Sequence, residues 1–147
     1  MKNGIRSVLE LFGIVCLRFR PVPRIWAIWL LAVNGACLLF ITHVEAQVLL
    51  AVTGLAVIVQ AAIYQRIGFT RVLGIVHLMW IPTFIWMATR AEAIQADPAL
   101  ATWIAVLFAT NLVSLVIDIA EVIRFARGDR APHYHWAKAP ATRGLVA

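Results

Sequence analysis

The sequence predicts an all-α membrane protein with four transmembrane helices in an antiparallel up-down bundle, preceded by an interfacial amphipathic helix. Of the 147 residues, 63% are hydrophobic and 14% are charged, whereas soluble domains carry about 25% charged residues. Four segments approach the roughly 20 apolar residues that cross a bilayer, and none alternates like a barrel strand. Because lipid offers no partners to backbone polar groups, helices are the remaining solution.

Residues 1–22 are predicted to form the amphipathic helix, lying on the cytoplasmic membrane surface. Its apolar side chains recur at near-helical spacing: Ile5, Val8, Leu9, Phe12, Val15 and Phe19. The segment is too short to span, and Pro21 and Pro23 end it. A signal peptide is the alternative, since Val44-Glu45-Ala46 resembles a cleavage site, although the apolar run before it is longer than usual.

The transmembrane domain is expected to cover residues 23–127, with spans at 23–42, 46–64, 71–89 and 101–123. The connections are short, which favours antiparallel neighbours. Gly68 can take a positive φ in the second connection, and Asp97-Pro98 is typical of a helix start in the third. Pro82 is expected to kink the third span or to loosen a backbone hydrogen bond there.

The distribution of positive charge predicts the orientation. Twelve of the thirteen Lys and Arg residues fall before residue 25, between residues 66 and 71, or after residue 123, and only Arg90 lies on the other side. Both termini should therefore be cytoplasmic, with residues 128–147 as a flexible tail. The abundance of Arg and Ala suggests a bacterium, and thus its inner (plasma) membrane. No aromatic-interleaved basic patch is present, so nucleic acid is not expected as a partner.

Polar residues inside the bilayer are costly and usually face protein. Every expected span carries some of them on one face. They are Asn34; Thr53, Gln60 and Tyr64; Thr70, Gly74 and His77; and Asn111, Ser114, Asp118 and Glu121. We therefore expect two inward-facing polar layers. The cytoplasmic layer holds Gln60, His77 and Asp118, and the mid-membrane layer holds Asn34, Asn111 and Ser114.

Asp118 is the most informative of these residues, because an Asp near the centre of a span costs about 2.5–3.5 kcal/mol on insertion scales. His77 is the one candidate at similar depth that can become cationic. Three interpretations stay open. The pair fixes the packing of the third span on the fourth, it titrates to move a proton or ion or to bind a polar headgroup, or Asp118 snorkels to the surface beside Glu121 and Arg124.

The opposite face of the fourth span carries small residues at four-residue spacing: Ala101, Ala105 and Ala109, continued by Leu112, Val116 and Ala120. Such spacing lets helix backbones approach closely, so this face could meet a second protomer or another protein. The alternative is that Ala is simply common in this chain.

No catalytic set is recognisable. Ser114 is a mid-helix residue without a nucleophile turn, Cys16 and Cys37 form no redox pair, and no phosphate-binding Gly motif occurs. Bis-histidine haem is not expected, and His133 and His135 alone are a weak metal signal. The sequence therefore predicts no cofactor, no metal and no enzyme activity.

The sequence favours a non-enzymatic protein that acts by association, as an accessory or assembly subunit or a homo-oligomer in the lipid bilayer. The alternative is a small proton- or cation-coupled transporter or channel that uses His77 and Asp118. Binding of lipid or quinone near Trp80 and Pro82 is a third possibility.

Overall fold

The computed structural model describes residues 4–128, and within this range the chain forms helices and turns without a strand. The elements are α1 (Gly4–Gly13), η1 (Ile14–Arg18), α2 (Pro21–Gly35), η2 (Ala36–Phe40), α3 (Val44–Ile67), η3 (Arg71–Met79), α4 (Trp80–Ala88), α5 (Ala91–Gln95) and α6 (Pro98–Ala126). Four helical stretches are long and apolar enough to cross a membrane: Pro21–Phe40, Val44–Ile67, Arg71–Ala88 and Pro98–Ala126. This confirms the predicted all-α chain with four candidate spans. The tail was expected at residues 128–147. From residue 129 onward, and so including His133 and His135, it lies outside the described residues.

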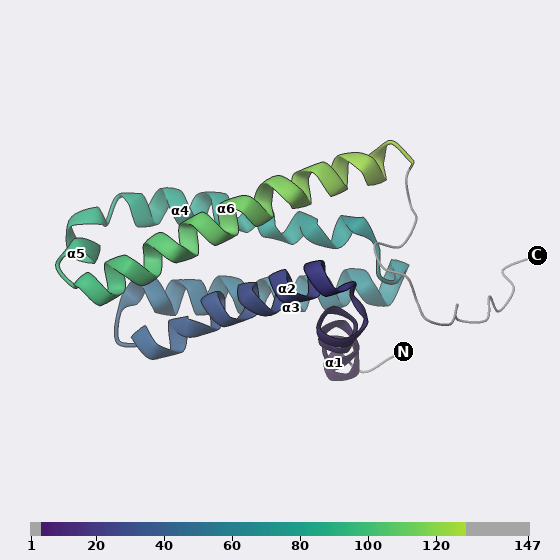
Figure 1. The fold of residues 1–147 in the computed structure, drawn as a ribbon, viewed down its shortest axis with the longest axis horizontal. Coiled ribbons are helices and arrows are strands. Elements are labelled where there is room, and N and C mark those ends of the chain that lie inside the picture. The colour runs from purple at the N-terminus through teal and green to yellow at the C-terminus, as the bar shows by residue number, and fades with distance from the viewer. Residues whose placement is uncertain (1–3, 129–147) are drawn as a thin grey trace, which may run out of the picture.

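The long helices run side by side in two layers (Figure 1). One layer holds α6 with η3 and α4, and the other holds α2 and α3. The layers meet where α6 contacts α2 and where α3 contacts η3 and α4. Helix α1 lies across one end of the fold, and α5 lies at the opposite end.

Local turn chemistry defines two of the helix ends. The Asp97 carboxylate accepts hydrogen bonds from the backbone N–H groups of Ala99 and Leu100, which satisfies free donors in the first turn of α6. Gly68 ends α3 with a φ of 76°, a conformation that favours glycine. Both features confirm what the sequence predicts at these turns.

The third span is not one α-helix. Its first half, η3, is a 3₁₀-helix of nine residues, and α4 begins at Trp80, two residues before Pro82. A proline lacks the N–H that an α-helix requires, and its ring crowds the carbonyl four residues earlier, here that of Leu78. The helix type therefore changes close to this proline. Runs of 3₁₀-helix this long are uncommon.

Helix α1 packs on α3 and η3 through one narrow side. Leu11 is buried against Ala61 and Leu73, and the Tyr64 hydroxyl donates a 3.0 Å hydrogen bond to Glu10 Oε2. Ile5 and Leu9 point away from the rest of the chain and are exposed. The helix therefore keeps part of its apolar face unburied.

The tightly packed core occupies the half of the fold nearer α5. Leu49, Met87, Leu100 and Leu107 are almost fully buried there. The Trp103 indole N–H donates a 3.0 Å hydrogen bond to the Val33 carbonyl, and its ring stacks on Phe40 with centroids 4.9 Å apart. The candidate site lies in the other half, nearer α1.

Candidate functional site

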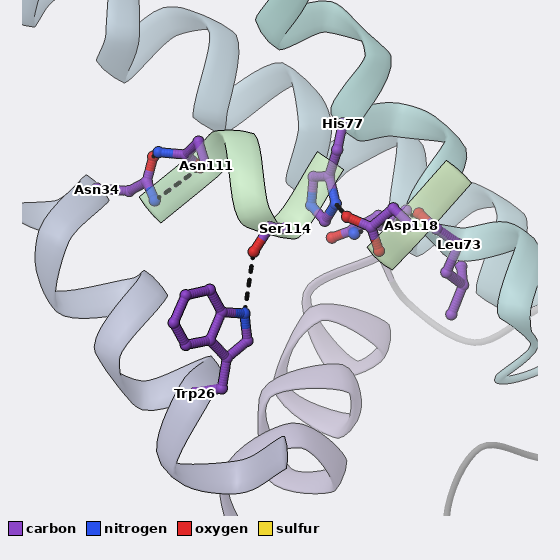
Figure 2. Close-up of polar contacts among 8 residues, drawn as sticks. Trp26, Asn34, Leu73, His77, Asn111, Ser114 and Asp118 are labelled. Carbon is purple, nitrogen blue, oxygen red and sulfur yellow. Dashed lines mark hydrogen bonds and ion pairs between the residues drawn. The ribbon is translucent and has the colours of Figure 1, made fainter. Parts of the chain in front are cut away.

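His77 and Asp118 contact each other directly across the interface between η3 and α6. His77 Nδ1 lies 2.6 Å from Asp118 Oδ2 (Figure 2). The two side chains keep 29% and 23% of their surface exposed. The pair is thus partly open rather than sealed in a dry core.

The helix type of η3 decides which of its residues face α6. In a 3₁₀-helix, residues three apart lie above one another. Arg71, Gly74 and His77 therefore form one row, and the first and last of them contact Glu121 and Asp118 of α6. The α-helical spacing used for the sequence analysis assigned Thr70 rather than Arg71 to this row.

Gly74 allows this close approach. A β-carbon at residue 74 would lie 2.6 Å from Asp118 Oδ1 and 2.9 Å from Asp118 Cβ. Real β-carbon contacts are not that short, so any larger residue would force η3 and α6 apart or displace the carboxylate. The backbone of Gly74 is not in the left-handed region, so its conformation does not require a glycine. The lack of space for a side chain does.

An ion-pair network continues the row toward the end of α6. Arg71 Nη1 pairs with Glu121 Oε2, and Arg124 Nη1 lies 3.1 Å from Glu121 Oε1. Glu121 belongs to the polar stripe that the sequence predicts on α6, whereas its partner Arg71 was not predicted. The signal was the spacing of Arg71 and His77, which is a multiple of three.

Asn34 and Asn111 form the second polar contact, between α2 and α6. Each amide donates to the oxygen of the other at 3.3 Å, and each also donates to a carbonyl one turn earlier in its own helix. Both residues are buried. The two side chains therefore tie α2 to α6 deep in the fold.

Two tryptophans that the sequence analysis did not assign to the site extend this contact. Trp26 Nε1 donates to Ser114 Oγ at 3.0 Å, and Trp29 Nε1 donates to Thr110 Oγ1 at 3.1 Å. The spacing of these residues in the sequence could have indicated the two contacts. The two indoles are three residues apart on α2, and the two hydroxyls are four residues apart on α6, so each pair shares a helix face.

Gln60 lies near the His77–Asp118 pair but bonds elsewhere. Its Nε2 donates to the Leu73 carbonyl at 3.4 Å, a long contact that joins α3 to η3. The nearby Thr53 and Thr70 hydroxyls are buried and have no hydrogen-bond partner among residues 4–128. This side of the site therefore retains unused hydrogen-bonding capacity.

All six candidate polar residues line one cavity of about 590 Å³: Asn34, Gln60, His77, Asn111, Ser114 and Asp118. The rest of the wall is mostly apolar and comes largely from α1, η1, α2 and α3, with Leu11, Val15, Leu30 and Val57 among its residues. Pockets for small ligands commonly measure about 300–1,000 Å³ and combine an apolar wall with a few convergent polar groups. The cavity therefore has the size and composition of a ligand site.

The predicted helix-packing face of α6 consists of three alanines. Ala105 and Ala109 are exposed on the outer side of α6, and Ala101 is half-buried. Within the described range, no group of three or more His, Cys, Asp or Glu side chains is placed to hold a metal ion. Among the groups that line the cavity, His77 and Asp118 offer hydrogen bonding and proton exchange by an imidazole and a carboxylate.

Comparison of the chain with protein-family models, with curated proteins and with solved structures finds no match.

Proposed function

We propose that the chain is an integral protein of a bacterial inner (plasma) membrane, with four antiparallel spans and both termini in the cytoplasm. In support, the basic ends of α2, η3 and α6 gather at the same end of the fold as α1 (Figure 1). Clustered positive charge at one end is typical of the cytoplasmic side. Helix α1, with Ile5 and Leu9 exposed, would then lie in the interface with its free apolar face toward lipid.

We further propose that the protein is a small carrier that conducts protons through the His77–Asp118 pair, with the cavity beside the pair as its ligand site. The observation that carries this proposal is that the pair is both directly bonded and part of the wall of a ligand-sized cavity. Intramembrane ionisable residues mark ion and proton pathways by default. Arg71 and Glu121, the other charged residues on the wall, already pair with each other.

Proton flux into sealed vesicles tests this function. The full-length protein would be reconstituted with a pH-sensitive dye inside, and flux would be driven by an imposed membrane potential. We expect wild-type vesicles to take up protons faster than protein-free vesicles, and Asp118→Asn to fall to the protein-free rate. Equal rates for wild type and Asp118→Asn, or no flux above protein-free vesicles, would reject the proposal.

The chain supplies a matched control for this experiment. His43 and Asp97 form a second His–Asp contact, 3.4 Å apart, in the turns at the opposite end of the fold and outside the cavity. Asp97→Asn makes the same chemical change and keeps a good helix cap. It should leave proton flux at the wild-type rate.

Association with a second protomer or another membrane protein is a second candidate function. The observation that favours it is that Ala105 and Ala109 are exposed on the face of α6 that turns away from the buried Asn111 and Ser114. Small residues on an outward face allow close helix packing in a membrane. On this proposal, the alanine face of α6 (Ala101, Ala105 and Ala109) is the contact surface of a homo-oligomer or accessory subunit.

Disulfide cross-linking in native membranes tests the association. In a background without Cys16 and Cys37, Ala105→Cys should give a cross-linked dimer or a heteromeric product upon oxidation. Val106→Cys, on a neighbouring exposed side of α6, should give much less. Equal cross-linking of the two variants, or none for Ala105→Cys, would argue against a specific interface on this face.

A further inference from the structure

The His77 ring has one nitrogen without a hydrogen-bond partner in the described part of the chain. Nδ1 contacts Asp118, and an ionised carboxylate can only accept a hydrogen bond, so the proton of a neutral ring lies on Nδ1. Nε2 is then left as a bare acceptor. No residue from 4 to 128 hydrogen-bonds to it, although His77 lines the cavity.

Ser114 supplies the complementary donor. It lies one turn before Asp118 on α6 and lines the same cavity as His77, and Figure 2 shows its hydroxyl directed toward Trp26. Its oxygen accepts from the Trp26 indole, which leaves the hydroxyl proton available. His77 and Ser114 thus offer an acceptor and a donor, the pair of partners that a hydroxyl group requires, and the Thr53 and Thr70 hydroxyls of the same wall add to this capacity.

The charges on the wall disfavour an anionic headgroup. Arg71 is the only Lys or Arg among the residues that line the cavity, and it is paired with Glu121. Asp118 and Glu121 would in addition repel a phosphate or carboxylate. A ligand that carries a full negative charge would therefore lose its hydration without gaining an available cation.

The rest of the wall fits an apolar body. Side chains from α1, η1 and α2 face those of α3 across the cavity, among them Phe12, Val15, Leu30, Ala56 and Val57. Burial of apolar ligand surface against such a wall is favourable, and it leaves the polar group to fix orientation.

We propose that the cavity binds an uncharged amphiphile whose polar end is a hydroxyl group, which donates to His77 Nε2 and accepts from Ser114 while its apolar body lies among the side chains of α1, α2 and α3. This inference rests on the proposed function, which makes the cavity a ligand site. The shared chemistry has two natural sources: a phenol or quinol, and an aliphatic alcohol such as a diacylglycerol.

Binding of simple probes to the full-length protein in nanodiscs tests the ligand class. The tryptophan emission of the protein would report binding, since Trp26 and Trp80 line the cavity, and empty nanodiscs would correct for partitioning into lipid. The probes are 4-nonylphenol, dioctanoylglycerol, nonylbenzene, 4-nonylbenzenesulfonate and dodecyltrimethylammonium. The two hydroxyl probes identify the source: tighter 4-nonylphenol indicates a phenol, and tighter dioctanoylglycerol indicates an aliphatic alcohol.

We expect at least one hydroxyl probe to bind about tenfold more tightly than nonylbenzene, which is the size expected for one net hydrogen bond to a buried group. His77→Phe should remove this preference, whereas His43→Phe, outside the cavity, should keep it. Equal binding of nonylbenzene and both hydroxyl probes, or tighter binding of either charged probe, would overturn the proposal.

Asp118→Asn gives an independent check that does not depend on loss of the ring. The amide can either donate to or accept from Nδ1, so the proton of His77 is no longer held on that nitrogen. A ketone probe, 4′-nonylacetophenone, should then bind within about twofold of 4-nonylphenol, whereas wild type should favour the phenol about tenfold. An unchanged tenfold preference in Asp118→Asn would contradict the assignment of Nε2 as acceptor.

The outcomes separate this inference from the proposed function. If the hydroxyl preference is present but Asp118→Asn leaves proton flux unchanged, the ligand assignment stands and the proton-coupled role fails. If proton flux depends on Asp118 but no hydroxyl preference appears, the ligand assignment alone fails.

Discussion

Gly74 lies so close to Asp118 that there is no space for a side chain at residue 74. A β-carbon at residue 74 would stand 2.6 Å from Oδ1 and 3.0 Å from Cγ of Asp118. The carboxylate in turn lies 2.6 Å from His77 Nδ1. The position of the candidate site therefore depends on how closely η3 can approach α6 at this glycine.

Replacing Gly74 with Ala should destabilise the protein and disturb the pair. Extra methyl groups in a packed interface typically cost about 1–3 kcal/mol. We expect a lower midpoint of thermal unfolding in detergent and a reduced proton flux. Gly54→Ala in α3 is the matched control, because a β-carbon there meets nothing within 4 Å. If both substitutions had the same effect, close packing at Gly74 would not be the reason.

Asn34 and Asn111 should show energetic coupling. Each single change to Ala leaves the other amide with one partner fewer, so the double variant should lose less stability than the sum of the two single variants. Interhelical hydrogen bonds in membranes contribute about 0.6 kcal/mol on average, and we expect coupling of that order. Unfolding by SDS titration of all four proteins measures it. Strict additivity would show that the two amides act independently.

Substitution of Arg90 alone should lower the free energy of unfolding more than substitution of Arg90 and Glu45 together. The Glu45 side chain is only 4% exposed, and its Oε1 lies 2.6 Å from Arg90 Nε. Arg90 also lies over the Trp86 ring, 5.4 Å from its centroid. Arg90→Gln would leave the Glu45 carboxylate buried without its charged partner. We expect this to lower the free energy of unfolding by about 1–3 kcal/mol, because the partly exposed Arg90 position lets water reach the carboxylate.

Addition of Glu45→Gln to Arg90→Gln should recover part of this loss, because the double variant buries no unpaired charge. Thermal unfolding of the two variants in the same detergent checks the order. A double variant less stable than Arg90→Gln would indicate that Glu45 has a role beyond this pair.

The cap at Asp97 should stabilise α6. Asp97→Ala removes the acceptor for the N–H groups of Ala99 and Leu100, a change that typically costs about 1 kcal/mol. Asp97→Asn should cost much less, because Asn is an equally good cap. Hydrogen exchange at the first turn of α6, followed by mass spectrometry, should speed up in Asp97→Ala alone. Comparable exchange in both variants would assign the effect to the lost His43 contact instead.

Much of the architecture could be predicted from local signals. The four apolar stretches, the turn at Gly68 and the cap at Asp97 each depend on a few consecutive residues, and the structure confirms them. The polar stripe of α6 also followed from the sequence, because α6 is a regular helix whose period is known. The partners of this stripe were harder to predict. The indoles of Trp26 and Trp29 bond to Ser114 and Thr110, contacts that the sequence did not predict.

The sequence by itself determined that this chain forms four apolar helical stretches, since apolar length and turn chemistry are local properties. Only the tertiary structure decided that Arg71, Gly74 and His77 stand in one row against α6. In an α-helix, Arg71 and His77 would lie about 120° apart around the axis, whereas in the 3₁₀-helix of η3 they align. Nine residues are too few for a hydrophobic pattern to distinguish these two periods, and contacts with α6 and α3 made the difference.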